Sequence, residues 1–66
     1  MLTMLKKFRK EKRLTQKELA NSLHISQTSV SKYERGVSEP DIAMLIAMSD
    51  YFGVTVDKFI RTSDEI

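Results

Sequence analysis

A row of hydrogen-bonding side chains lies between Ser26 and Gly36, in the stretch SQTSVSKYERG. If this stretch is a helix, Val30 and Tyr33 fall on its inner side. The side chains that then point outward are those of Gln27, Thr28, Ser31, Lys32 and Arg35. Their amide, hydroxyl, ammonium and guanidinium groups form hydrogen bonds. A nucleophile, a base and an orienting group cannot be assembled from the sequence, so we expect a binding protein and not an enzyme.

Metal chemistry is not predicted either. The chain has one histidine, His24, and no cysteine, and His24 has no nearby pair of carboxylates. Metal sites usually combine several such ligands. We therefore expect no metal and no cofactor, and a structural role for His24.

The length of 66 residues allows one small domain, residues 1–66 with an ordered core of about 2–61. Without cysteine, no disulfide can stabilise it. The apolar N-terminal residues give way to charge too early for a signal peptide, and the sequence lacks a run of eighteen apolar residues. These features predict a soluble, cytoplasmic protein with no membrane association.

Charge is divided unevenly along the chain. Residues 1–36 carry a net charge of +6 and residues 37–66 a net charge of −4. A basic half is typical of a protein that binds a polyanion such as nucleic acid. Solvated lysines on ordinary helices give a similar pattern, so charge alone leaves both interpretations open.

The pattern of helix breakers and caps predicts an all-α fold with five short helices. Only two glycines and one proline are present. The helices are expected at about 2–12, from Thr15, between Ser26 and Gly36, from Pro40 and Asp41 through about Phe52, and from Thr55 over Val56, Phe59 and Ile60. Thr15 and Glu18 have the spacing of a capping box. The link of His24 and Ile25 is so short that the helices on either side must cross steeply.

Residues 14–36, LTQKELANSLHISQTSVSKYERG, resemble the helix-turn-helix of the phage repressor and Cro family. The following EPDIAMLIAMSDYFGVTVDKFI resembles the fourth and fifth helices of that family. The resemblance implies a five-helix lambda-repressor-like DNA-binding domain whose second and third helices form the helix-turn-helix. One departure is His24, at a turn position that is usually glycine. Histidine is enriched among residues that adopt the left-handed conformation, so the turn can be kept.

The resemblance also implies roles for the polar row. Base-reading positions fall on Gln27, Thr28 and Lys32, with Ser26 and Ser31 at the margin. In the major groove glutamine pairs with adenine, lysine donates to guanine, and the threonine methyl group contacts the thymine methyl group. The alternative is a solvated helix face, which would be richer in glutamate and lysine pairs.

Phosphate contacts are expected beside this helix, because backbone contacts fix the register of a protein on DNA. The candidates are Gln16, Lys17 and Arg35. Gln16 is favoured, since the start of a helix adds backbone N–H donors.

Arg9 lies on an apolar stripe and Glu34 faces inward near Val30. The resemblance implies that these two charges pair between the first and third helices. Otherwise both side chains would extend separately to solvent.

The helix through residues 40–52 is apolar nearly all round. We expect Ile42, Leu45, Ile46 and Phe52 to enter the core, and a second face to form a homodimer interface. That face consists of Met44, Ala47, Met48 and Tyr51. The alternative is that its methionines lie singly on the surface.

These observations predict a sequence-specific double-stranded DNA-binding transcriptional regulator that reads the major groove with residues 27–35. Repression is favoured, and activation stays open, because a bound protein can either exclude or contact polymerase. We expect a homodimer on a palindromic operator, and no small-molecule effector is evident. The alternative is an antitoxin-like protein-interaction module with subsidiary DNA binding. Antitoxins often carry a long disordered tail, and only about six residues follow the last expected helix.

Overall fold

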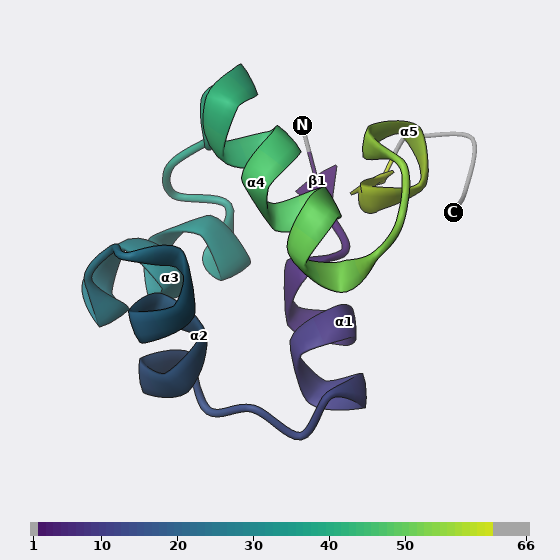
Figure 1. Ribbon diagram of the computed structural model, residues 1–66. Helices are drawn as coiled ribbons and strands as arrows, with labels where there is room; N and C mark the ends of the chain where they lie inside the picture. Colours follow the sequence, from purple (N-terminus) through teal and green to yellow (C-terminus); the bar gives the residue numbers. More distant parts are fainter. Residues whose placement is uncertain (1, 62–66) are drawn as a thin grey trace.

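Five helices and one pair of short strands make up the computed structural model, which describes residues 2–61 (Figure 1). The helices are α1 (Leu5–Glu11), α2 (Gln16–Leu23), α3 (Gln27–Arg35), α4 (Ile42–Phe52) and α5 (Val56–Phe59). The strands are β1 (Leu2–Thr3) and β2 (Ile60–Arg61). The five predicted helices and the all-α class are confirmed, with the strand pair as an addition.

Capping side chains begin most of the helices at the predicted residues. Thr15 and Glu18 form the capping box, in which the Glu18 N–H donates to Thr15 Oγ1 over 3.0 Å and the Thr15 N–H donates to Glu18 Oε1 over 2.8 Å. Ser26 and Thr55 cap α3 and α5. One boundary differs from the prediction. The cap of α4 is Asp41, and Pro40 lies buried before it instead of in the first turn.

Left-handed residues end α2 and α3. His24 has φ 59° and ψ 39°, so it takes the turn conformation that was expected of it. Gly36 follows α3 with φ 74°, where glycine avoids the steric cost of a side chain. Two local features therefore fix the turn between α2 and α3: the left-handed conformation of His24 and the Ser26 cap.

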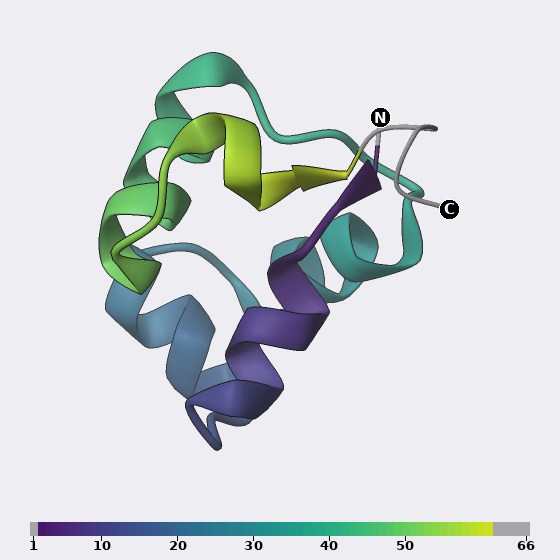
Figure 2. The same ribbon diagram turned by 90° about the vertical axis from the view of Figure 1, so that its right-hand side faces the viewer.

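The predicted start of α1 near residue 2 is wrong. Leu2 and Thr3 are extended and pair in antiparallel register with Arg61 and Ile60 (Figure 2). The Met4 N–H also donates to the Phe59 carbonyl over 2.8 Å. These long-range hydrogen bonds satisfy backbone groups that would otherwise continue a helix, and they join the two ends of the described chain.

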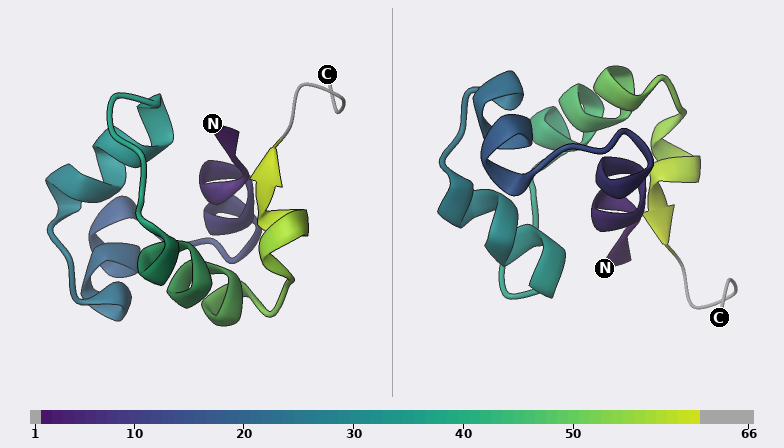
Figure 3. Two further views of the ribbon diagram at one scale, coloured as in Figure 1. Left: turned by 90° about the horizontal axis from the view of Figure 1, so that it is seen from above. Right: turned by 90° about the horizontal axis from the view of Figure 1, so that it is seen from below.

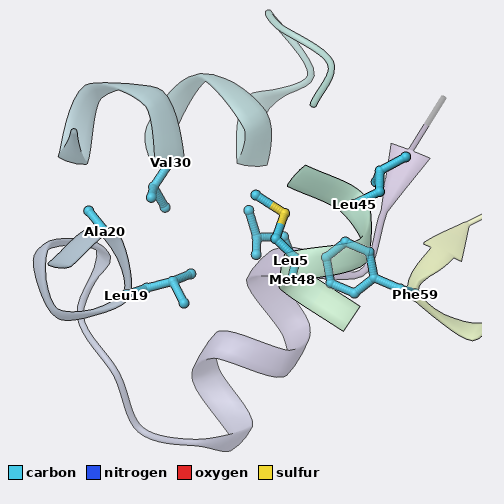
Figure 4. Close-up of a cluster of buried hydrophobic side chains, with 7 residues drawn as sticks. All are labelled: Leu5, Leu19, Ala20, Val30, Leu45, Met48 and Phe59. Atoms are coloured by element: carbon cyan, nitrogen blue, oxygen red, sulfur yellow. The ribbon is translucent and has the colours of Figure 1, made fainter. Parts of the chain in front are cut away.

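The hydrophobic core lies where α1, α2, α3, α4 and α5 meet (Figure 4). Its buried side chains are Leu5, Leu19, Ala20, Val30, Leu45, Met48 and Phe59. Phe8 and Phe52 pack beside Phe59, with ring centroids 5.6–6.1 Å apart. Seen from above and from below, α2 and α3 lie together on one side of the molecule and α5 lies on the other side (Figure 3). Helix α4 runs between them.

The predicted faces of α4 are wrong in part. Met48 is 0% exposed, whereas Ile42 is 75% and Ile46 47% exposed. Ser49 takes a core position, because its hydroxyl donates to the Ile46 carbonyl over 3.0 Å and so leaves no unpaired polar group. The buried side of α4 is therefore formed by Leu45, Met48 and Ser49 and is rotated about the helix axis relative to the predicted side.

The predicted dimer face is therefore not a free surface. Met48 is in the core, and Met44 and Tyr51 are partly buried against it. The Tyr51 hydroxyl also donates to Ser22 Oγ over 3.3 Å. Of the four expected interface residues, Ala47 is exposed.

Among the described residues, every helix is too short or too polar to span a lipid bilayer.

Replacing Met48 by alanine tests the position of α4. Met48→Ala removes a fully buried side chain, so we expect the free energy of unfolding to fall by about 2–5 kcal/mol. Met44→Ala is the matched control, because Met44 is only partly buried and should cost less. Urea unfolding followed by circular dichroism measures both. Equal costs would show that α4 is rotated differently.

Candidate nucleic-acid interface

Helix α3 presents most of the predicted polar row to solvent. Gln27, Thr28, Lys32 and Arg35 are exposed, whereas Val30 is fully buried against the core. The hydroxyl-bearing Ser31 is only half-exposed. The structure thus brings Gln27, Thr28 and Lys32 onto the solvent side of one short helix.

Ser26 has a structural task at the start of α3. Its Oγ accepts the Ser29 N–H over 3.1 Å and lies 2.9 Å from Ser29 Oγ. Such a cap holds the first turn of the helix and satisfies one of its free donors. Ser29 was not singled out in the sequence, where nothing distinguishes it from its neighbouring serines.

The predicted ion pair joins α1 to α3. Arg9 Nε donates to Glu34 Oε2 over 2.6 Å, and Arg9 Nη2 donates to Glu34 Oε1 over 3.2 Å. The side chains are 11% and 3% exposed, so the alternative in which each reaches solvent separately is excluded. This bidentate contact fixes both the distance and the angle between the Arg9 guanidinium and the Glu34 carboxylate.

Two further hydrogen bonds at this pair were not predicted. Arg9 Nη1 donates to the Leu14 carbonyl over 2.8 Å, and Gln16 Nε2 donates to Glu34 Oε1 over 3.0 Å. Together with Glu34, these residues form the Arg9–Glu34 network, which links α1, the α1–α2 loop, α2 and α3. A glutamine at the first position of a helix is ordinary, so the sequence contained no signal for its contact with Glu34.

The expected phosphate candidates lie in different settings. Gln16 is half-buried at the first residue of α2, and Lys17 beside it is exposed. Arg35 is exposed, and its Nε makes a long 3.4 Å hydrogen bond to the Ser31 carbonyl in its own helix. The side chains of Lys17 and Arg35 can therefore reorient toward a ligand. The amide of Gln16, by contrast, is held by its hydrogen bond to Glu34.

Charge supports a nucleic-acid ligand on the side of α1 to α3. Five basic side chains on and after α1 are exposed: Lys6, Lys7, Lys10, Lys12 and Arg13. Lys12 Nζ lies 5.7 Å from the centre of the Tyr51 ring, within the range of a cation–π contact. The acidic side chains Asp41, Asp50 and Asp57 are exposed from the start of α4 onward.

The sequence matches known helix-turn-helix proteins. A family model described as helix-turn-helix matches residues 5–59. The chain is 39% identical over 62 residues to the HTH-type transcriptional activator BcrR of Enterococcus faecalis, covering 94% of this chain and 30% of that protein. It is 36% identical over 62 residues to the HTH-type transcriptional regulator ImmR of Bacillus subtilis, covering 94% of this chain and 48% of that protein.

A shorter relative matches along its whole length. The uncharacterized HTH-type transcriptional regulator MJ0272 of Methanocaldococcus jannaschii is 33% identical over 66 residues, covering 98% of this chain and 100% of that protein. By contrast, the chain spans half or less of BcrR and ImmR.

A solved structure supports the fold. The SOS-response transcriptional repressor LexA from Eubacterium rectale superposes with a TM-score of 0.81 at 24% identity, covering 89% of this chain and 63% of that chain. At this identity the likeness concerns the fold alone.

The Arg9–Glu34 pair gives a stability prediction. Replacing either residue by methionine leaves the partner's charge buried and uncompensated, so we expect each single variant to lose about 3–5 kcal/mol. The double variant Arg9→Met/Glu34→Met should lose less than the sum, because neither charge remains. A double-mutant cycle by urea unfolding measures the coupling. Additive losses would mean that the two side chains do not interact in solution.

Proposed function

Because the chain belongs to the helix-turn-helix family of phage repressor and Cro type, we propose that it is a sequence-specific transcriptional repressor that reads double-stranded DNA with α3. The observation that carries the proposal is the exposed set Gln27, Thr28 and Lys32 on a helix whose inner side is fixed by Val30 and Glu34. A rigid helix can hold its side chains in register with base edges. Since its proposed partner is DNA, we expect the protein to act in the cytoplasm, where that DNA lies.

Each polar residue has a proposed task in the complex. Gln27, Thr28 and Lys32 contact base edges, and Ser31 lies at the margin of that contact. Ser26 acts through the helix cap, since its hydroxyl already holds the Ser29 N–H. Gln16, Lys17 and Arg35 contact phosphates on either side and set the register of α3 in the groove. Repression follows where the operator overlaps the polymerase site, because the bound protein then excludes polymerase from the same DNA.

Two copies are needed for a long operator. The Cα atoms of the chain extend 31 Å along the longest axis, which is less than the ~34 Å between successive major grooves on one side of DNA. One copy with one reading helix therefore reaches only one groove. We propose a homodimer on a palindromic operator, in which each copy reads one half-site.

The exposed face of α4 supports a dimer at a different place from that expected from the sequence. This α4 apolar face consists of Ile42, Ala43, Ile46 and Ala47. Its two large aliphatic side chains, Ile42 and Ile46, are exposed to water. Contiguous exposed apolar surface is typical of association sites.

The base-reading assignment can be tested on single-base variants of an operator selected from random DNA. Gln27→Ala should remove discrimination at one base pair, worth about 1–3 kcal/mol, because only Gln27 contacts that base edge. Lys17→Ala is the control, since a phosphate contact should weaken binding to all variants by a similar factor. Competition binding measures both. A uniform loss with Gln27→Ala would place that residue outside the groove.

The dimer can be tested without changing the charge of the protein. In the double variant Ile42→Gln/Ile46→Gln, both exposed isoleucines become neutral residues with good helix propensity. We expect the wild type to sediment as a dimer and this variant as a monomer with an unchanged circular dichroism spectrum. A wild type that stays monomeric at micromolar concentration, with and without DNA, would contradict the homodimer.

A further inference from the structure

Glu34 has more hydrogen-bond partners than an ion pair requires. Its Oε2 accepts from Arg9 Nε, and its Oε1 accepts from both Arg9 Nη2 over 3.2 Å and Gln16 Nε2 over 3.0 Å. The carboxylate is 3% exposed and therefore does not itself face DNA. It touches the residue that is proposed to contact a phosphate, and it does so from the reading helix α3.

The contact restricts the side chain of Gln16. A free glutamine at the start of a helix samples several rotamers, and binding a ligand costs the entropy of choosing one. In this structure one hydrogen of the Gln16 amide is used by Glu34, which leaves the second hydrogen for an acceptor outside the network. The amide is therefore oriented before any ligand arrives.

Arg9 makes the arrangement compatible with an anionic ligand. A lone carboxylate next to Gln16 would repel a phosphate. This repulsion would be strong, because the site is shielded from water and its effective dielectric constant is low. The two hydrogen bonds from Arg9 compensate the charge of Glu34. Gln16 then presents an amide donor next to the Arg9–Glu34 ion pair, which has no net charge.

We propose that Glu34, held by Arg9, is a positioning residue that orients the Gln16 amide toward a phosphate oxygen of DNA. The proposal rests on the DNA-binding function proposed above. Because Glu34 lies on α3 and Gln16 on α2, it also fixes the phosphate contact relative to the base-reading side chains. The network thus acts on affinity through Gln16, in addition to its role in holding the helices together.

The test compares the cost of one substitution in two backgrounds. Gln16→Ala is measured in the wild type and in the Arg9→Met/Glu34→Met variant, which removes the acceptor but leaves the net charge unchanged. In the wild type we expect an operator affinity about tenfold lower, the size of a hydrogen bond to a charged group. In the variant background we expect a loss below about threefold, since the amide is no longer oriented.

Lys17→Ala serves as the matched control. Lys17 is exposed on the same turn of α2 and makes no contact with Glu34 in the described structure, so its substitution should cost the same factor in both backgrounds. If the methionine variant does not fold, as judged by circular dichroism, Arg9→Leu/Glu34→Leu provides the second background, because it also removes both charges and the acceptor. There too the cost of Gln16→Ala should shrink and the cost of Lys17→Ala should stay constant.

The outcomes separate the two proposals. A wild type that shows no preference for any duplex sequence would overturn the proposed function. A wild type that binds its operator, with an equal cost of Gln16→Ala in both backgrounds, would overturn only the positioning role of Glu34. A parallel change in the costs of Gln16→Ala and Lys17→Ala would also overturn it, because it would indicate a general disturbance of α2.

Discussion

The partly buried ion pair of Arg9 and Glu34 determines how α3 is held against α1. The core of this chain is small, and without cysteine no disulfide can add to it. The hydrophobic effect is non-directional, whereas a bidentate ion pair has a fixed geometry. Arg9 reaches from α1 to α3 and to the Leu14 carbonyl, so one side chain orients three segments at once. Its value lies in specifying this arrangement more than in net stability.

Much of the fold could be predicted because its signals are local. The Thr15 and Glu18 capping box, the Ser26 cap and the left-handed Gly36 act within four residues of chain, so their types and spacing were enough. The left-handed turn at His24 was expected from the family resemblance, since glycine usually holds that position, and histidine is compatible with the conformation. The Arg9–Glu34 pair spans a longer distance, and it was expected from the family resemblance and not from the spacing alone.

The parts that were missed depend on contacts between distant segments. The strands β1 and β2 are two residues each, too short for a sequence pattern, and they exist because backbone groups near the two ends meet. The phase of α4 was missed because the expected core face contained apolar residues only, whereas Ser49 is buried with its hydroxyl satisfied within the helix. Arg13 is left-handed with φ 58°, and its residue type did not indicate this.

We propose that α3, held in place by the Arg9–Glu34 network, reads a specific DNA sequence. The decisive measurement is selection of bound duplexes from a random pool by the wild-type protein. We expect enrichment of one motif that occurs as two inverted copies, with centres about one helical turn, 10–10.5 base pairs, apart. A protein that retains duplexes without enriching any motif would contradict it, because binding would then depend on the phosphate backbone alone.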